Sequence, residues 1–551
     1  MTEIRRTRSV CPRCLRQLPA RQLRDEQGRV WLEKECPEHG LFRTLIWRGY
    51  ADLEEWRVGA SLLEQEEELD CPSCSHGICA NHQQGSCCVL LNVTQRCNLS
   101  CRFCFAQADA RQHPANEPTL EELKRDMDNI AEDCIRRDGH CCTIILSGGE
   151  PTLRDDLPEL MTYIKQRGAP YIQLNSNGIR LGEDEDYVRA LAKAGLDYVF
   201  LQFDGVDDTV YRTLRGRPLL ETKIKCIELC GKYRIGVTLV PVVARGVNEN
   251  QVGDIVRFGA ARSPVVRGVH FQPVSYFGRF PTCPEDDDRY TLDELIRDLT
   301  QQIGLSEDYV LPSCCDHPLC GFHSGFMVQE NGTLLPLSRR AAYTGEKTTA
   351  QQNREYVGSR WSRETGPLDW GEESCCCDTA GECGCCDTTE SCCCDTTEPC
   401  CCGDTPATEN CCCGDTPATE NCCCGDTPAA EGCCCGEAPA AENCCCDTAG
   451  ECGCGETSSE EEACCCCGNH ETSEEELLIA WESHREMDLD EFIARAKKYS
   501  FTVSAMPFQD ALNLDIERLR RCSLHVYQDG VIKPFCSRYL TAMPLELPEE
   551  K

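Results

Sequence analysis

Three cysteines, Cys97, Cys101 and Cys104, have the type and spacing to hold an iron–sulfur cluster. They follow the apolar run VLLNVT in the segment QRCNLSCRFCFAQA, with spacing C-x3-C-x2-C. Three thiolates on one short loop can ligate three irons of a [4Fe–4S] cubane, which leaves the fourth iron without a protein ligand. A zinc site is the alternative, but zinc loops rarely sit on a β/α unit that is followed by a GGEP segment.

An open iron of this kind is what chelation of S-adenosylmethionine requires. The amino and carboxylate groups of S-adenosylmethionine can occupy it, which places the sulfonium near the cluster. One electron from the cluster can then cleave the S–C5′ bond and release a 5′-deoxyadenosyl radical. We expect the ring of Phe103 to pack beside the adenine.

Polar residues that follow three later apolar runs are candidates for binding the same cofactor. The first of these runs ends in SGGEP, whose adjacent glycines permit close backbone approach and whose Glu150 can accept from the cofactor's ammonium. The next two end in NSNG and LQFDG. The candidate cofactor-binding residues besides Phe103 are Ser147, Gly148, Gly149, Glu150, Pro151, Asn175, Asn177, Gln202 and Asp204. No catalytic side chain is assigned.

Repeated β/α units must position these residues. Nearly continuous apolar runs, typical of parallel strands buried on both faces, occur at 89–93, 143–146, 171–175, 198–203, 236–243 and 266–274. Helical patterns lie between or after them at 120–137, 155–166, 221–232 and 292–303, and Thr119 before Glu122 predicts a capping box. We expect an α/β fold, a partial (β/α)6 barrel with functional residues at the carboxyl ends of its strands.

Cysteines outside this loop predict further metal centres in small N- and C-terminal extensions of the barrel. Near the N-terminus, CPRC and CPEH form a knuckle for one iron or one zinc, with ligands Cys11, Cys14, Cys36 and His39. A second group predicts an auxiliary [4Fe–4S] cluster and comprises Cys71, Cys74, Cys79, His82 and either Cys87 or Cys88.

A third group consists of cysteines that lie far apart in the sequence, Cys320, Cys522 and Cys536, with Cys314 or Cys315 to complete the site. The segment LHVYQDGVIKPF between Cys522 and Cys536 predicts a hairpin whose turn is QDG. Cys134, Cys226 and Cys230 fall on apolar helix faces, where a free cysteine usually packs as a small hydrophobe. His270 could line a substrate cavity, although a packed histidine is the more common case.

Residues 371–470 differ from the rest of the chain. The chain has 551 residues, 52 cysteines and a net charge of −37, and this window holds 30 of the cysteines and 22 acidic residues without any Lys or Arg. The CCC triplet recurs there every 11 residues. We interpret the window as a disordered linker, with soft-metal storage and cluster delivery as alternatives. Without the window the charge is −15, and a nucleic-acid partner is disfavoured because it needs clustered Lys and Arg.

The composition shifts divide the chain into six predicted segments. These are a zinc-ribbon or rubredoxin-like knuckle at 1–60, an auxiliary-cluster segment at 61–87, the barrel at 88–310, a connecting segment at 311–370, the cysteine-rich insertion at 371–470 and a C-terminal auxiliary-cluster domain at 471–551. The opening residues lack the apolar run of a signal peptide, and no stretch could span a bilayer. We therefore expect a cytoplasmic protein.

The segments RCNLSCRFCFA, LSGGEPTLRDDLPE and LQFDG resemble the radical S-adenosylmethionine superfamily over roughly residues 88–305. TRSVCPRCL, ECPEHG, CPSCSHGICANH, FQPVSYFGR and SAMPFQDALNLDIERLRRCSLHV flank them in the order of one family. That family includes archaeal tetraether lipid synthase and members described as methyltransferases of 6-hydroxymethyl-dihydropterin. The resemblance implies extra iron centres and radical attack on an unactivated C–H bond, and it stops at the cysteine-rich window.

The resemblance leaves two reactions open. One forms a C–C bond on a lipid chain, and the other transfers a methyl group to a pterin-like heterocycle. A long apolar cavity would favour lipid, and a compact polar cavity would favour pterin. The expected partners are this substrate and a low-potential electron donor such as ferredoxin or flavodoxin; membrane contact is expected only for a lipid substrate. The competing hypothesis is a metal-storage protein with a vestigial barrel.

Overall fold

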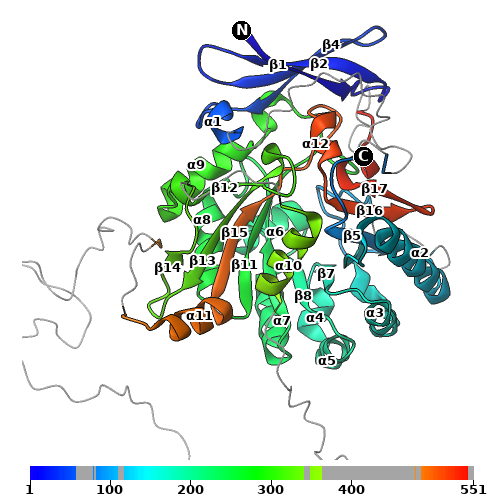
Figure 1. The fold of residues 1–551 in the computed structure, drawn as a ribbon, viewed down its shortest axis with the longest axis vertical. Coiled ribbons are helices and arrows are strands. Elements are labelled where there is room, and N and C mark those ends of the chain that lie inside the picture. Colours follow the sequence, from blue (N-terminus) through cyan, green and yellow to red (C-terminus); the bar gives the residue numbers. More distant parts are fainter. Residues whose placement is uncertain are drawn as a thin grey trace, which may run out of the picture. The chain divides into compact units, whose positions relative to one another are not determined.

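Two β-sheets organise the protein (Figure 1). The computed structural model describes residues 1–57, 78–79, 82–108, 117–340, 348–362, 478–479 and 485–543. An antiparallel sheet of four strands comes first in the chain, and a mixed sheet of 13 strands contains the predicted barrel. The cysteine-rich window at 371–470 lies outside the described residues, as do Cys71 and Cys74.

The N-terminal sheet is a simple meander. Its strands are β1 (Thr2–Val10), β2 (Gln17–Arg24), β3 (Val30–Cys36) and β4 (Gly40–Trp47), and each pairs antiparallel with the next. The short helix α1 (Leu53–Arg57) follows.

One buried carboxylate, that of Asp515, joins the N-terminal sheet to the C-terminal part of the chain. It accepts hydrogen bonds from Thr7 Oγ1 at 2.7 Å, Arg5 Nη1 at 3.2 Å and Gln22 Nε2 at 3.3 Å. Asp515 also caps helix α12 (Ile516–Arg520) through the Glu517 N–H. The sheet is therefore fastened to a segment that lies at the other end of the sequence.

Six parallel strands confirm the predicted partial barrel. In spatial order they are β5 (Cys88–Thr94), β6 (Thr143–Gly148), β7 (Ile172–Ser176), β8 (Tyr198–Gln202), β9 (Gly236–Val240) and β11 (Val266–Pro273). Each pairs in parallel with its neighbour. The two-residue strand β10 (Val242–Val243) pairs with β11. Their nearly continuous burial matches the apolar runs from which they were predicted.

Helices cross from strand to strand as expected. They are α2 (Leu120–Asp138), α3 (Leu157–Gln166), α4 (Ile179–Glu183), α5 (Glu185–Lys193), α6 (Asp208–Arg215), α7 (Leu220–Lys232), α8 (Val252–Ala260) and α9 (Leu292–Ile303). The capping box predicted at Thr119 and Glu122 is present, and Gly139 ends α2 in the left-handed conformation.

The sheet is wider than the six predicted strands, because C-terminal segments join both of its edges. Strand β15 (Ser500–Ala505) pairs in parallel with β11, and β16 (Leu524–Gln528) pairs in parallel with β5. Strand β13 (Phe322–Val328) then runs antiparallel to β15 and pairs with β12 (Leu311–Pro312) and β14 (Leu334–Pro336). The C-terminal residues are thus part of the barrel wall.

The predicted hairpin is also present. Strand β16 pairs with β17 (Val531–Pro534), and the turn residues Asp529 and Gly530 both have positive φ, at 51° and 80°. Such φ values at both central residues match the twist of a tight hairpin. Helix α13 (Phe535–Arg538) follows and carries Cys536.

Helix α10 (Ala350–Trp361) packs against the wall formed by β9, β11 and β15 (Figure 1). Thr349 and Gln352 form a capping box at its start. Gly236, the first residue of β9, and Tyr171, just before β7, lie against its last turn, at Trp361 and Gly358. Because both contacts are at the amino ends of strands, α10 lies across the floor of the barrel, opposite the ends where cofactor-binding residues were predicted. Helix α11 (Leu489–Lys498) leads into β15.

Among the described helices, none combines the length and the apolar character needed to cross a membrane.

Candidate functional site

The loop after β5 holds Cys97, Cys101 and Cys104, and the segment after β11 fixes its shape. The Cys104 N–H donates to the Arg279 carbonyl at 2.9 Å, and the Arg279 N–H donates back to the Cys104 carbonyl at 2.9 Å. Arg279 Nε also donates to the Cys101 carbonyl at 3.0 Å. The loop backbone is therefore held from outside, so that its thiols are free to act as ligands.

The glycine pair at the end of β6 makes the closest backbone approach in the site. The Gly149 N–H donates to the Thr94 carbonyl and the Glu150 N–H donates to the Arg96 carbonyl, both at 2.8 Å. A Cβ at Gly148 or Gly149 would overlap those same carbonyl oxygens, and Gly148 has a φ of 129°. The two glycines therefore let the end of β6 pack against the start of the cysteine loop. The sequence analysis had explained them by the close approach of a ligand.

Glu150 is almost fully buried, and its carboxylate is the centre of a hydrogen-bond network. Oε1 accepts from the Thr152 hydroxyl at 2.6 Å and the Ser176 hydroxyl at 2.7 Å, and Oε2 accepts from the Asn177 N–H at 2.7 Å. Burial raises the pKa of Glu150, and these donors oppose that rise. Among the described residues Oε2 has one donor, so it keeps a further acceptor position, and Glu150 lines the large cavity.

A buried ion pair lies directly behind Cys101. The Arg215 guanidinium makes two hydrogen bonds of 2.7 Å to the Asp204 carboxylate. The pKa of Arg215 is raised because the attraction of Asp204, Cys101 and their hydrogen bonds outweighs the effect of burial. Asp204 is fully buried, is not part of the cavity lining and holds Arg215 next to a thiol of the loop, so the cofactor contact expected for Asp204 stays a prediction.

Lys223 of α7 forms hydrogen bonds to two of the candidate cofactor-binding segments, those at the ends of β7 and β8. Its Nζ donates to the Asn177 carbonyl and, at 3.1 Å, to Gln202 Oε1. Burial lowers the pKa of Lys223 to about 8. Asn177 Nδ2 in turn donates to Asn98 Oδ1 at 2.7 Å, which ties the end of β7 to the cysteine loop.

A cavity of about 640 Å³ extends from the cysteine loop into the barrel. The predicted ligands that line it are Cys97, Cys101, Cys104, Phe103, Ser147, Gly148, Gly149, Glu150, Asn175, Asn177, Gln202, Cys87 and Cys320. Pro151 and Asp204 are not part of its lining. The structure therefore gathers most of the candidate residues around one space large enough for a cofactor and a substrate.

The part of the cavity wall that lies away from the cysteine loop includes two aromatic rings and the imidazole of His270. His270 of β11 is 5.6 Å from the ring of Phe200 and 6.1 Å from the ring of Trp361, measured between centroids. His270 Nδ1 and the Ser504 hydroxyl are 2.9 Å apart. Burial lowers the pKa of His270 to about 4, so the ring is neutral near pH 7 and both lines the cavity and packs within it.

The N-terminal knuckle is a compact four-ligand site. One ligand atom from each of Cys11, Cys14, Cys36 and His39 lies within 4.8 Å of all the others. His39 Nδ1 is 3.4 Å from Cys36 Sγ and 3.6 Å from Cys11 Sγ. Three sulfurs and one imidazole nitrogen at these separations fit a tetrahedral zinc ion.

The remaining candidate ligands are more scattered. Cys536 is buried, and Cys320 and Cys522 are partly buried. Burial, Asp316, Cys536 and Cys320 all raise the pKa of Cys522, so these groups act on one another electrostatically. Arg518 Nε lies 3.5 Å from Cys320 Sγ, and the Gln509 N–H donates to Cys536 Sγ at 3.3 Å. His82 instead contacts the Cys522 carbonyl through Nε2 at 2.8 Å.

Cys79 packs against Ile516. Cys88, Cys314 and Asp316 line the large cavity next to Cys87, although the sequence analysis left Cys88 and Cys314 as alternatives and did not consider Asp316. Asn353 of α10 donates to Cys87 Sγ at 3.4 Å.

Sequence reasoning missed the residues that α10 and β13 contribute to the cavity. These are Gln352, Asn353, Tyr356, Val357, Arg360, Trp361, Phe322 and His323. Only the TTAQQ capping pattern before α10 could have marked that helix, because its apolar residues follow no clear helical period.

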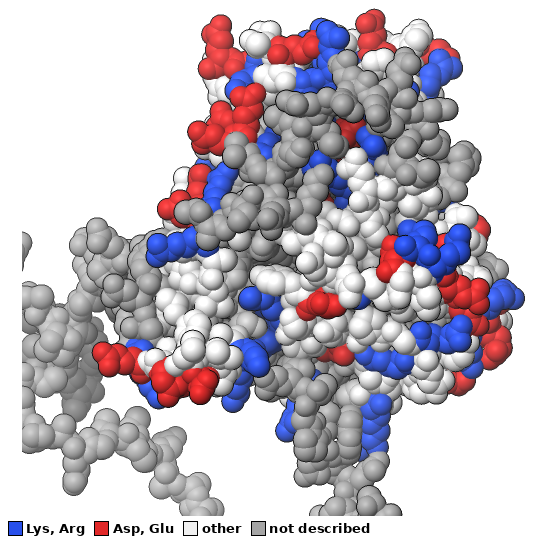
Figure 2. Space-filling model, viewed as in Figure 1, with Lys and Arg blue, Asp and Glu red and all other residues white. Residues whose placement is uncertain are grey.

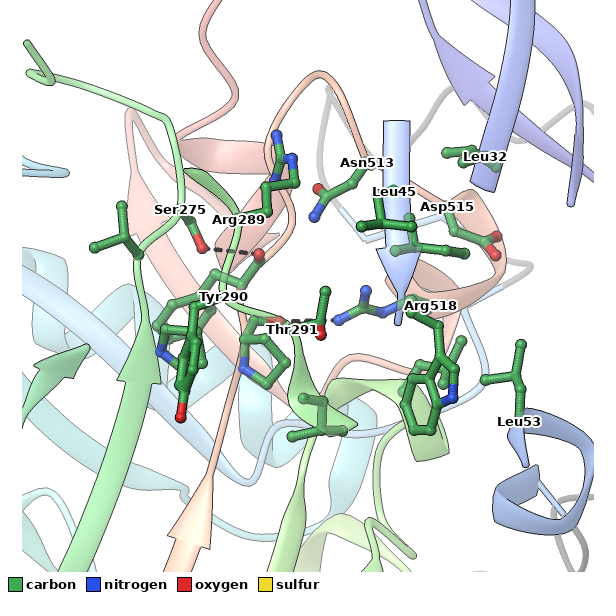
Figure 3. Close-up of a pocket in the computed structure, with 18 of the residues that line it drawn as sticks. Leu32, Leu45, Leu53, Ser275, Arg289, Tyr290, Thr291, Asn513, Asp515 and Arg518 are labelled. Carbon is green, nitrogen blue, oxygen red and sulfur yellow. Dashed lines mark hydrogen bonds between the residues drawn. The ribbon is translucent and has the colours of Figure 1, made fainter. Parts of the chain in front are cut away.

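A second, smaller cavity of about 60 Å³ lies where the N-terminal sheet meets the barrel (Figure 3). Leu32, Leu45, Arg289 and Arg518 are among the residues that line it. Arg518 Nη2 donates to the Pro507 carbonyl at 3.0 Å, so its charge is held in place within the protein. This space has room for water and is too small for a substrate.

Charged side chains are interspersed on the face of the molecule drawn in Figure 2. Many pair with each other, for example Lys124 with Glu121 and Glu159, or Arg180 with Asp155 and Asp184. Such exposed pairs contribute little to stability.

The residues of the cysteine loop fit a [4Fe–4S] cluster that binds S-adenosylmethionine. Three thiols face one cavity, the loop backbone is fixed by Arg279, and Glu150 lines the same space. Such a triad on the first loop of a parallel half-barrel, with room beside it, defines the class of radical S-adenosylmethionine enzymes.

Comparison with known proteins supports this class. Residues 91–259 match the model of the Radical SAM superfamily, and residues 3–48 match the HMPTM N-terminal zinc ribbon domain. The chain is 35% identical over 384 residues to a Methanocaldococcus jannaschii protein named 7,8-dihydro-6-hydroxymethylpterin dimethyltransferase, over 64% of this chain and 74% of that protein. The chain therefore belongs to the radical SAM superfamily, and it is an enzyme of the transferase type.

Other relatives are more distant. A Thermococcus kodakarensis protein named as a probable GTP 3′,8-cyclase is 32% identical over 33% of this chain and 56% of its own length. The solved structure of a radical SAM methyltransferase from Sphaerobacter thermophilus has a TM-score of 0.31 and 14% identity, and the match covers 55% of this chain and 74% of that one.

Proposed function

We propose that the protein transfers a methyl group to a carbon atom of a small nitrogen heterocycle of the pterin class. The observation that carries this proposal is the pairing of aromatic rings with polar side chains on the cavity wall. Phe200, Trp361 and His270 offer ring faces, and Gln272, whose amide has no hydrogen-bond partner in the described chain, lines the same space. A fused heterocycle uses both kinds of contact, because its faces stack and its edges hydrogen-bond.

The relative from Methanocaldococcus jannaschii supports the same substrate class, since its name specifies a hydroxymethylpterin. Burial keeps His270 neutral, so its ring can hydrogen-bond to a neutral heterocycle without adding an unpaired charge. The Ser504 hydroxyl orients that ring through its contact with Nδ1.

In the proposed reaction, Cys97, Cys101 and Cys104 would hold the cluster, and residues at the ends of β6, β7 and β8 would bind the cofactor. The bound cluster and S-adenosylmethionine would supply a 5′-deoxyadenosyl radical after one-electron reduction. Glu150, held by Asn177 and Ser176, would accept from the cofactor's ammonium, and Phe103 would pack beside the adenine. Ferredoxin or flavodoxin in the cytoplasm is the proposed electron donor.

C–C bond formation on a lipid chain is the second candidate. The observation that favours it is the apolar portion of the cavity wall, which includes Leu90, Ile145, Val240, Phe322 and Phe508. An acyl or isoprenoid chain needs only such contacts, and it would leave the Gln272 amide without a partner. The polar groups therefore favour the heterocycle.

We also propose that the N-terminal knuckle at 1–60 binds one zinc or iron ion and that Cys320, Cys522 and Cys536 hold an auxiliary [4Fe–4S] cluster. The nearby Cys87, Cys88, Cys314 and Cys315 are the candidates for completing it. We keep as proposals the barrel at 88–310, the connecting segment at 311–370 and the auxiliary-cluster region at 471–551, whose strands β15 and β16 join the barrel sheet. The auxiliary segment at 61–87 and the insertion at 371–470 remain predictions, because most of the first and all of the second lie outside the described residues.

The test is anaerobic turnover of the full-length protein after dithionite reduction. For each methyl group, one S-adenosylmethionine would give the radical and leave as 5′-deoxyadenosine and methionine, a second would give its methyl group and leave as S-adenosylhomocysteine, and dithionite would supply the electrons. Reaction with 6-hydroxymethyl-7,8-dihydropterin should therefore yield these products and a pterin heavier by one methylene per methyl group, all followed by liquid chromatography and mass spectrometry. A parallel reaction offers a dialkyl glycerophospholipid. Cleavage with a modified lipid and an unmodified pterin would replace the first candidate by the second. A form lacking 371–470 that loses its bound metal and shows no cleavage would favour metal storage.

A further inference from the structure

The region of the cavity next to α10 contains an arginine without a counter-ion. Arg360 lies in the last turn of α10 and lines the large cavity. Its Nη1 is buried and has no hydrogen-bond partner, and within the described chain no carboxylate pairs with it. A buried guanidinium normally pairs with an acid or an acceptor, because leaving its donors unsatisfied is costly.

Two local contacts explain how the Arg360 side chain is held but do not satisfy its donors. The guanidinium stacks over the ring of Tyr356, with its Cζ 4.4 Å from the ring centroid. Its position in the last turn of α10 is also favourable, because carbonyl dipoles make the end of a helix partly negative. Neither contact accepts a hydrogen bond from Nη1.

Three polar groups, one of them the Arg360 guanidinium, lie close to one point next to Gly325. The position that a Cβ of Gly325 would occupy is 3.4 Å from Arg360 Nη1, 3.7 Å from the Tyr356 hydroxyl and 3.9 Å from Ser338 Oγ, and these are its three nearest atoms. The Ser338 hydroxyl is buried and also lacks a hydrogen-bond partner among the described residues. A guanidinium and two hydroxyls thus surround a space that exists because residue 325 has no side chain.

This space faces the substrate cavity. Gly325 pairs with Thr502 across β13 and β15, and Thr502 lines the cavity. Residues directly opposite in an antiparallel pair point to the same face of a sheet, so the missing side chain of Gly325 would point into the cavity as well. Next along the same face is His323, which pairs with Ser504 and lines the cavity near Tyr356.

The charge of the space is positive. The Arg360 charge contributes, after burial, to lowering the pKa of His323 to about 4, which leaves this imidazole neutral near pH 7. Tyr356 and Ser338 add hydroxyl donors without adding charge. One cation with two neutral donors suits an oxyanion, and a tripod of donors suits a tetrahedral one.

We propose that Arg360, Tyr356 and Ser338, grouped around Gly325, bind a phosphate group that is esterified to the substrate. The inference deepens the proposed function and rests on it for what the phosphate is attached to. The phosphate would be carried by a hydroxymethylpterin, as its phosphate ester, or by the headgroup of a lipid. In either case the site would anchor the substrate at one end of the cavity while its reacting carbon lies nearer the cysteine loop.

The first experiment measures anion binding without turnover. Inorganic phosphate and pyrophosphate are titrated into the anaerobic full-length holoenzyme by isothermal calorimetry, with acetate as a planar anion for comparison. We expect phosphate to bind more tightly than acetate, and Arg360→Gln to weaken phosphate binding at least ~10-fold, as for loss of a charge-assisted hydrogen bond. Equal phosphate affinity in wild type and Arg360→Gln would overturn the proposal.

Two further variants separate loss of the site from loss of the fold. Gly325→Ala places a methyl group at the convergence point; its nearest neighbour would be 3.4 Å away and its φ is not left-handed, so the fold should tolerate it while phosphate binding falls. Arg262→Gln removes an arginine that also stacks on a ring, 3.5 Å from the Phe258 centroid, but on α8 and its connection to β11. It should leave phosphate binding unchanged. Normal phosphate binding in Gly325→Ala would contradict the proposed location.

The second experiment identifies the source of the phosphate. The KM for 6-hydroxymethyl-7,8-dihydropterin is compared with that for its phosphate ester, and binding to vesicles of dialkyl glycerophosphate is compared with binding to vesicles of neutral dialkyl glycerol in phosphatidylcholine. One phosphorylated member of the two pairs should be preferred, and Arg360→Gln should remove that preference. Absence of any preference in wild type would overturn the proposal. Absence of methyl transfer with intact phosphate binding would instead overturn only the proposed function.

Discussion

The two best-defined groups of metal-ligating residues differ in how completely the protein surrounds the metal. In the N-terminal knuckle, four ligand atoms from two turns of the meander lie within 4.8 Å of one another. In the cysteine loop, three thiols face a cavity of about 640 Å³. A complete ligand set leaves a metal no position for chemistry, whereas an incomplete set beside a cavity leaves one. The comparison assigns stability to the first site and reactivity to the second.

The largest expected contrast comes from removing one thiol from each site. Cys101→Ala should lower 5′-deoxyadenosine formation by at least ~10³-fold, because a cluster iron loses its ligand. Cys14→Ala should leave the rate within about twofold but lower the thermal midpoint, because a structural metal contributes folding energy to its own domain. Iron, sulfide and zinc contents and the cleavage rate are measured for both variants. Equal loss of cleavage in the two variants would remove the distinction between the sites.

A large effect on stability is expected from the buried Arg215–Asp204 ion pair, which lies behind Cys101 of the cysteine loop. Arg215 and Asp204 have side-chain exposures of 6% and 0%, and Asp204 would remain buried without its partner in Arg215→Gln. Breaking such a pair costs about 3–5 kcal/mol of unfolding free energy. Chemical denaturation of the holoenzyme measures this value. The double variant Arg215→Gln with Asp204→Asn serves as the control and should recover part of the loss.

The pH dependence of the unfolding free energy should reflect His270, which lines the large cavity. Its pKa is about 4 in the folded protein and near 6.5 in the unfolded chain, so the unfolded chain binds the extra proton as pH falls through this range. His270 therefore costs no stability above about pH 6.5 and costs about 3 kcal/mol at pH 4 and below. The difference in unfolding free energy between wild type and His270→Gln, measured from pH 7 to pH 5, isolates the effect. A difference that is constant with pH would contradict a neutral buried imidazole.

The smallest effect on stability is expected for a charged pair in the N-terminal sheet that carries the knuckle. Arg21 Nε donates to Glu33 at 2.8 Å, but the Arg21 side chain is 54% exposed. The Glu33 side chain is 4% exposed, but it keeps Arg43 as a second partner, so loss of the bond from the exposed Arg21 should cost at most about 1 kcal/mol. Arg21→Gln should therefore shift the thermal midpoint only slightly and leave zinc content unchanged. Loss of zinc in Arg21→Gln would show that the knuckle depends on charges outside its ligand set.

Local patterns in the sequence were sufficient to predict the partial barrel and the residues that its cysteine loop and the ends of β6, β7 and β8 contribute to the cavity, but not the residues that α10 and β13 contribute. The apolar runs gave β5 to β11, and the Thr119 capping box and the QDG turn were found where the pattern put them. Asp204 shows what the same reasoning left out. Its place after a strand predicted a cofactor contact, but only the tertiary structure shows that Arg215, a residue on the following helix, occupies its carboxylate.

Long-range pairing explains the other differences. Strand β15 joins β11 and strand β16 joins β5, although hundreds of residues separate the members of each pair in the sequence. No local period can predict which edge a strand will join. Arg360, Ser338 and Gly325 are close for the same reason, because α10 folds back against β13 and β15.

The position of β15 between β11 and β13 has a consequence for synthesis on the ribosome. A nascent chain emerges from its N-terminus, so β5 to β11 leave the exit tunnel long before β15 and β16. The barrel keeps two unpaired edges during that interval, while the 30 cysteines of the window 371–470 are being translated. Iron supplied at that moment would meet many thiols that belong to no finished site. Cluster insertion is therefore expected to follow translation, after the last strands have closed the wall.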